Sequence, residues 1–190
     1  TYYKRGNYTD DLSSMVVRIV WYGMHVTTEL NNYKINKRKM SNKIAEKFIV
    51  DILKTGFKRA AESFSQLIGK TVRITNEQPV ILVKKGENHP ILANEEGELI
   101  VLTTQLMGDI TGKSFLILSQ VESQEIFKTL GLKLSEPLKE GFLLEIDNII
   151  SATVIADICN ELEIEVYGDV PHLFRVHADD LQDFMKSKVS

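Results

Sequence analysis

The chain's apolar positions follow two long helical periods. Between residues 42 and 69, and again between residues 139 and 162, apolar side chains recur at three- and four-residue spacing. This spacing places them on one face of an α-helix. Ser41 or Asn42 is suited to cap the first helix, and Gly69 to end it. The pattern predicts two long amphipathic helices, each burying one face.

Outside these helices the apolar residues either alternate with polar ones or form short continuous runs, as in β-strands. The predicted strands are Met15–Tyr22, Thr71–Thr75, Val80–Val83, Glu98–Met107, Lys113–Leu118 and Glu163–Tyr167, with a loop at Lys84–Pro90. After Pro171 the pattern predicts a short strand and then a helix or tail.

Turn and cap residues mark the ends of several of these elements. The segment from Gly108 to Gly112 has two glycines and Asp109, which suits a tight hairpin in which the Asp side chain holds backbone amides. Ser119 is expected to cap a short helix over 121–130, and Gly131 to end it.

The two long helices are related by a weak internal repeat. Displacing the chain by 94 positions places Asp51–Lys54 on Glu145–Asn148, and Val72 on Val166. Each copy is a long helix followed by a strand. Two such units predict a pseudo-symmetric α+β fold, with two long helices packed on an antiparallel sheet.

Residues 1–39 differ in composition from the rest and are treated as an N-terminal extension of unknown role. They are rich in Tyr, Asn, Lys and Thr, and Met40 could be a natural start site. The extension is expected either to add an edge strand or to lie outside the functional protein. Residues 40–190 are expected to form the main domain.

Composition narrows the possible partners. The chain has 190 residues, 43% of them hydrophobic, with a formal net charge of −3 and a pI of about 5.8. A general nucleic-acid binder needs a basic face, so with this negative net charge no nucleic-acid partner is expected. No apolar run reaches 18 residues, so no transmembrane helix or membrane partner is expected. The single cysteine, Cys159, is interpreted as structural, and the four scattered histidines give no metal-site spacing.

Candidate chemistry lies on the second long helix. Glu145 and Asn148 are three residues apart and therefore share one face of the helix. A carboxylate beside a carboxamide can hold a partner's cation and orient a water. The plainer interpretation is two solvent-facing polar residues. Both side chains are expected on the outer face, with Ile146 and Ile149 turned to the core, and Asp147 is expected to be a surface charge.

Three features together resemble the CheC/CheX/FliY family of chemotaxis phosphatases, over residues 42–175. Glu145–Asn148 is similar to the family's Glu-x-x-Asn helix motif, and Met107–Ser119 resembles its Gly-Asp-x-x-Gly hairpin and apolar strand. The third feature is the order of helix, strands, short helix, motif helix and strand. The resemblance is closest to CheX-like members.

The resemblance implies a phosphatase that accelerates hydrolysis of the phosphoaspartate of a CheY-type receiver domain. Asn148 would orient the attacking water, and Glu145 would pair with the receiver's active-site Lys. The enzyme would need no cofactor of its own, because the receiver carries the Mg²⁺. The family implies a cytoplasmic protein. A homodimer is expected through sheet edges formed by Glu98–Met107 and Lys113–Leu118.

The chain departs from the family pattern at informative positions. Gly141 stands where the family has Asp or Ser, and Ala152 where it has Gly. In the first helix, Lys54 occupies the position of Asn148. A Lys side chain cannot accept a hydrogen bond, so this half-site is interpreted as inactive. A non-catalytic adaptor or dimerisation domain that binds receivers through the same helix face remains the alternative function.

Overall fold

The computed structural model describes residues 18–26, 42–68, 80–83, 96–131 and 133–188. Its helices and strands, in chain order, are β1 (Arg18–Val26), α2 (Asn42–Ile68), β2 (Val80–Val83), β3 (Glu98–Gly108), β4 (Ile110–Ser119), α3 (Gln120–Leu130), α4 (Glu136–Leu162), β5 (Val166–Gly168), β6 (His172–His177), the 3₁₀ turn η3 (Ala178–Asp180) and α5 (Leu181–Lys188). Both long helices are present near the predicted bounds. The segments predicted at Thr71–Thr75 and Lys84–Pro90 lie outside the described residues.

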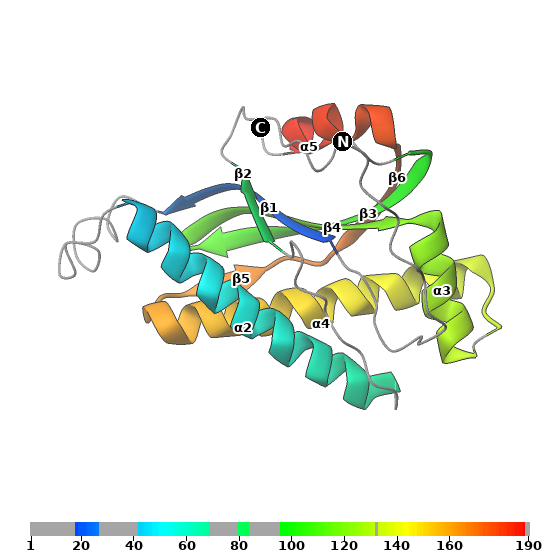
Figure 1. The fold of residues 1–190 in the computed structure, drawn as a ribbon, viewed down its shortest axis with the longest axis horizontal. Helices are drawn as coiled ribbons and strands as arrows, with labels where there is room; N and C mark the ends of the chain where they lie inside the picture. Colours follow the sequence, from blue (N-terminus) through cyan, green and yellow to red (C-terminus); the bar gives the residue numbers. More distant parts are fainter. Residues whose placement is uncertain (1–17, 27–41, 69–79, 84–95, 132, 189–190) are drawn as a thin grey trace, which may run out of the picture.

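The strands form one six-stranded sheet in the order β2-β1-β4-β3, with β5 and β6 both pairing with the far side of β3. Every pairing is antiparallel except that of β1 with β2, which is parallel. Figure 1 shows α2, α3 and α4 on one side of the sheet and α5 on the other. The predicted α+β architecture, with two long helices on a largely antiparallel sheet, is confirmed.

The two-residue period of the central strands divides the core into two clusters. On β3, Ile100, Leu102 and Leu106 face α2 and α4, while Leu99 and Val101 face α5. Every one of these five side chains is buried. The long helices therefore rest on a continuous apolar surface, which positions anything carried on their outer faces.

Part of the N-terminal extension is built into this sheet. β1 lies between β2 and β4, with Val20 opposite both Ile81 and Phe115. The expectation of an edge strand was therefore wrong, because β1 has a neighbour on each side. Hydrophobic alternation predicts a strand but gives no information on its neighbours in the sheet.

The expected dimer edge is also corrected. β3 pairs with β4 on one side and with β5 and β6 on the other, while β4 lies between β3 and β1. Both strands have a neighbour on each side, so neither is an edge through which a homodimer could pair.

The hairpin between β3 and β4 holds the segment that leads from α4 to β5. Asp109 Oδ2 accepts a hydrogen bond of 2.9 Å from the backbone N–H of Glu165, and its own N–H donates to the Glu165 carbonyl. Gly108 has φ +108°, and a Cβ there would lie 2.3 Å from the same carbonyl oxygen. The structural interpretation of Asp109 is confirmed. Gly112 lies within β4 opposite Leu106 and not in the turn.

The predicted caps of α3 are present. Ser119 accepts a hydrogen bond from the backbone of Glu122, whose side chain accepts in return from the Ser119 N–H, and Gly131 ends the helix in a left-handed conformation. α4 begins earlier than predicted, at Glu136, because Pro137 is accommodated in the first turn, where its missing N–H is not needed.

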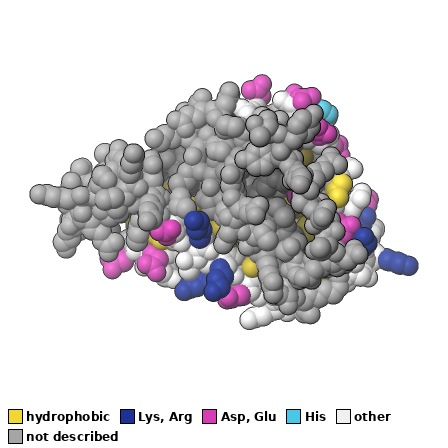
Figure 2. Space-filling model, viewed as in Figure 1, with side chains coloured by type: hydrophobic (Ala, Val, Ile, Leu, Met, Phe, Trp, Pro, Cys, Tyr) yellow, Lys and Arg dark blue, Asp and Glu magenta, His cyan; other side chains and the backbone are white. Residues whose placement is uncertain are grey.

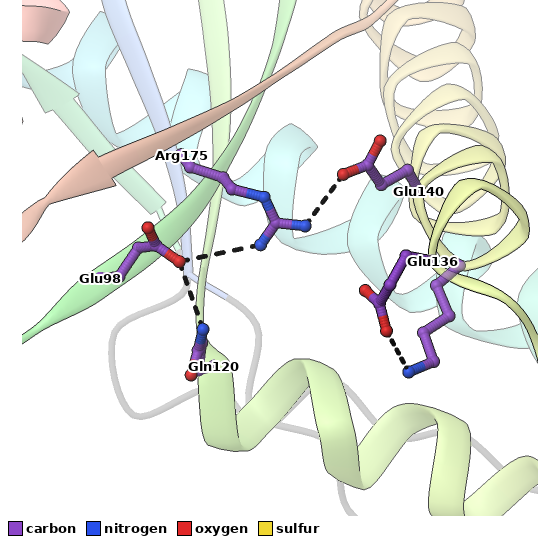
Figure 3. Close-up of polar contacts among 6 residues, drawn as sticks. Glu98, Gln120, Glu136, Glu140 and Arg175 are labelled. Atoms are coloured by element: carbon purple, nitrogen blue, oxygen red, sulfur yellow. Dashed lines mark hydrogen bonds and ion pairs between the residues drawn. The ribbon is translucent and has the colours of Figure 1, made fainter.

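A polar network ties the start of α4 to the sheet (Figure 3). Arg175 of β6 donates to Glu140 of α4 at 2.9 Å and lies 3.8 Å from Glu98 of β3. Gln120, the first residue of α3, also donates to Glu98, at 3.2 Å. The ion-paired side chains are more than a third exposed, so each contact contributes modestly to stability. Together they join α3, α4, β3 and β6 just before the turn that carries Glu145.

Candidate functional site

The site is built on two helices that run antiparallel across the same face of the sheet. Figure 1 shows the two helices running in opposite directions and crossing at an angle, with the start of α2 on the side where α4 ends. They are in close contact at Gly56, where a Cβ would lie 3.1 Å from the Cα of Val154. Near the beginning of α4, the rings of Phe64 and Phe142 are 6.3 Å apart. The second half of α2 therefore flanks the turn of α4 that carries the candidate residues.

Glu145 and Asn148 are both exposed on the outer face of α4. Ile146 is buried with 1% of its surface accessible, and Ile149 is half-buried. The orientation expected for Glu145, Asn148 and Ile146 is observed, and Ile149 is turned inward only partly. Within the described part of the chain the side chains of Glu145 and Asn148 have no hydrogen-bond or ion-pair partner. A carboxylate and an amide, one helical turn apart, are thus available to a partner.

An open groove of about 630 Å³ lies between the two helices, and its first lining residue on α4 is Ala152, one turn after Asn148. Eight of its nine lining residues form four pairs related by the 94-residue repeat: Arg59 with Thr153, Glu62 with Ala156, Ser63 with Asp157, and Gln66 with Asn160. The weak sequence repeat therefore places equivalent positions of the two helices around one groove.

The groove contains one ion pair that breaks its symmetry. Arg59 donates to Oδ1 of Asp157, which is 5% exposed, while the arginine side chain is 60% exposed. Oδ2 of Asp157 is buried without a hydrogen-bond partner among the described residues. The pair joins α2 to α4 within the groove.

The repeat-related pair on α2, Asp51 and Lys54, is also exposed. It lies toward the other end of the groove, since the helices are antiparallel. Lys54 places a primary ammonium where α4 has the amide of Asn148. Figure 2 shows Lys and Arg side chains beside Asp and Glu side chains along the lower part of this face, where Figure 1 draws α2 and the end of α4. The helix pair thus presents a mixed, not uniformly basic, surface.

Asp147, expected to be a surface charge, is buried at 2% exposure. Its Oδ2 accepts a hydrogen bond of 2.7 Å from Oγ1 of Thr104 on β3. Burial raises the pKa of Asp147 to about 6, and the hydrogen bond from Thr104 lowers it only in part. The internal repeat held the signal that was missed, because the position 94 residues earlier is the fully buried Leu53.

The two departures from the family pattern are both on the surface. A Cβ added at Gly141 would meet no atom within 4 Å. Ala152 is exposed and lines the groove. Neither residue obstructs the face that presents Glu145 and Asn148.

Other chemistry is limited in the described part of the chain. No group of three or more His, Cys, Asp or Glu residues there is arranged to hold a metal ion. Cys159 is half-buried, and its Sγ lies 3.3 Å from both the N–H and the carbonyl oxygen of Val166. No described helix combines the length and the apolar character that crossing a bilayer requires.

Comparison with known proteins identifies a fold. No protein-family model and no curated protein matches the chain. Among solved structures, FliY of Thermotoga maritima is similar with a TM-score of 0.56 and 16% sequence identity, over 75% of this chain and 73% of that one. The similar structure is a FliY, so the comparison does not support the expected CheX-like subgroup. At this identity it shows that the chain has a FliY-like fold.

Proposed function

We propose that this protein is a phosphatase of the CheC/FliY type, which accelerates hydrolysis of the phosphoaspartate of a CheY-type receiver domain. The observation that carries the proposal is the pair Glu145 and Asn148, exposed and unpartnered among the described residues on a long helix. The FliY-like fold and the resemblance of the two sequence motifs support it.

The chemistry needs little from the protein beyond positioning. An acyl phosphate hydrolyses slowly by itself, and the receiver's own Mg²⁺ neutralises charge. Asn148 would enter the receiver's active site, where its amide can donate to one group and accept from the attacking water. Glu145 would pair with the receiver's active-site Lys and fix the docked geometry. Neither role requires an altered pKa or a cofactor of this chain.

The proposal places the receiver over the outer face of the helix pair. Asn148 lies one turn from the start of the groove at Ala152, so a receiver docked on Asn148 would also cover part of the groove. Because receivers of this type act in the cytoplasm, the proposal includes a cytoplasmic location. A homodimer remains part of the proposal, through a surface other than the edges of β3 and β4.

A non-catalytic adaptor is the second candidate. The observation that favours it is Gly141, which leaves no side chain where the family has Asp or Ser. An adaptor would use the same exposed face to bind a receiver without accelerating dephosphorylation.

Phosphate release from a purified, phosphorylated receiver, with and without this protein, tests the proposal. Receivers from the same genome are the substrates, and each receiver's spontaneous dephosphorylation is the baseline. We expect a catalytic, concentration-dependent acceleration with at least one receiver. Binding to a receiver without acceleration would favour the adaptor, and neither binding nor acceleration with any receiver would contradict both.

A further inference from the structure

A buried acid lies between the two exposed residues of the site. Asp147 points to the sheet, while Glu145 and Asn148 point outward. Its hydrogen bond from Thr104, 2.7 Å long, is the one side-chain hydrogen bond between α4 and β3 within the described residues. The turn of α4 that carries the site is therefore tied to the middle of the sheet by a single polar contact.

The fold does not require a buried, hydrogen-bonded acid at position 147. A carboxyl group buried with one hydrogen bond costs stability compared with an apolar side chain. The equivalent position on α2 is Leu53, which packs in the same core cluster and is fully buried. A long helix can thus pack on this sheet with Leu there. The acid is found on the helix that also carries the amide.

The hydrogen bond supplies direction, which apolar packing does not. Burial of Ile146 and Ile150 turns their face of α4 toward the core. The hydrophobic effect is non-directional, so it does not fix the exact rotation of the helix, whereas a hydrogen bond fixes a distance and an angle. With side chains, an α-helix has a radius of about 5–6 Å, so a rotation of about 10° moves an exposed group by about 1 Å. A misplacement of about 1 Å can cost about a hundredfold in rate.

We infer that Asp147 is a positioning residue, which through Thr104 fixes the rotation of α4 about its axis and thereby the direction of Asn148 and Glu145. The inference rests on the proposed function for its effect on rate. Its effect on the geometry of α4 does not depend on that function.

Two threonines adjacent on β3 provide a matched test. Thr104 faces α4, whereas Thr103 faces the other side of the sheet, and they are 2% and 4% exposed. Thr104→Val removes the donor with little change in volume, and Thr103→Val is the control. We expect Thr104→Val to lower the maximal rate of assisted dephosphorylation about tenfold or more. The concentration of protein at half-maximal rate should change less than threefold, and Thr103→Val should change neither quantity.

Substitutions of Asp147 separate positioning from general stability. Asp147→Asn keeps an acceptor for Thr104, so it should retain most of the rate that Asp147→Leu loses. If Thr104→Val does not fold, Asp147→Leu carries the test, because Leu53 shows that Leu fits the equivalent position of α2. Equal rates for wild type, Thr104→Val and Asp147→Leu would overturn the inference.

A second readout is independent of phosphatase activity. The side-chain amide of Asn148 in ¹⁵N-labelled protein should shift or broaden in Thr104→Val and stay unchanged in Thr103→Val. If the wild type lacks phosphatase activity and this pattern is still seen, the proposed function fails and the positioning role holds. If the Asn148 signal is the same in both variants, the positioning role fails.

Discussion

The two long helices have the same length and share a groove, yet only one carries the candidate chemistry. α2 and α4 are each 27 residues long, and each exposes an acidic residue followed three positions later by a second polar residue. On α4 these are Glu145 and Asn148, and on α2 they are Asp51 and Lys54. Beneath them, α4 buries Asp147 where α2 buries Leu53.

The two helices pack into one core cluster although their exposed side chains differ and one buried position, Asp147 against Leu53, differs as well. Exposed substitutions change stability little, so Lys54 can replace an amide without affecting the core. The groove residues diverged too, since Arg59 pairs with Asp157 while their repeat partners, Thr153 and Ser63, form no such pair in the described chain. A long helix can therefore lack the amide that α4 carries at Asn148 and still support the fold.

Substituting Asn148 of α4 and its counterpart on α2, Lys54, should give the largest contrast. Asn148→Ala removes the group proposed to orient water, so assisted dephosphorylation should fall about a hundredfold or more, with receiver binding largely retained. Lys54→Ala is the matched control on α2 and should change the rate little. Rates are measured as phosphate release from a phosphorylated receiver. Full activity of Asn148→Ala would exclude the proposed mechanism.

The buried acid should give the next largest effect, on stability against pH. The pKa of Asp147 is raised to about 6 in the folded protein, while an unfolded Asp has a pKa near 3.8. Between these pH values the folded state binds more protons than the unfolded state. The contribution of Asp147 to the free energy of unfolding is therefore greatest below about pH 4 and falls as the pH rises through 6. The loss is on the order of 2–3 kcal/mol.

Urea unfolding of wild type and Asp147→Asn at pH 4 and pH 7 measures this effect. Other acids titrate alike in both proteins, so the difference between their pH dependences isolates Asp147. Asp147→Asn should lack the loss of stability between the two pH values. Parallel pH dependences would show that Asp147 is not an acid of raised pKa.

Removing the carboxylate on each helix should give a smaller contrast. Glu145→Ala deletes the proposed ionic contact to the receiver's Lys, so the dissociation constant for the receiver should rise about tenfold and the rate should fall with it. Asp51→Ala should leave both unchanged. Titration of labelled receiver measures binding, and equal weakening by both substitutions would mean that the two half-sites contribute alike.

The glycines of the two helices should give the smallest effects, with opposite signs. A Cβ at Gly56 would lie 3.1 Å from the backbone of Val154, so Gly56→Ala should destabilise the protein by about 1 kcal/mol. Gly141 faces open space, so Gly141→Ala should stabilise α4 by about 0.5–1 kcal/mol through helix propensity. Chemical denaturation measures both, and a stabilising Gly56→Ala would show that the helices are not in close contact there.

Local sequence signals determined much of this protein. The helical period gave the bounds of α2, and Ser119 and Gly131 gave those of α3, because caps and periodicity act between residues close in the chain. The same holds for the outward direction of Glu145 and Asn148, which follows from the apolar residues around them. The prediction that the Asp109 side chain accepts a hydrogen bond from a backbone amide was likewise confirmed.

Only the tertiary structure decided which segments meet. It put β1 inside the sheet, made β3 and β4 central strands, and brought the Glu165 amide to Asp109. It also brought Thr104 of β3 opposite Asp147, so that the buried carboxyl group has a hydrogen-bond donor. Contacts between distant segments depend on strand order and helix packing, and one sequence carries no local pattern that specifies them.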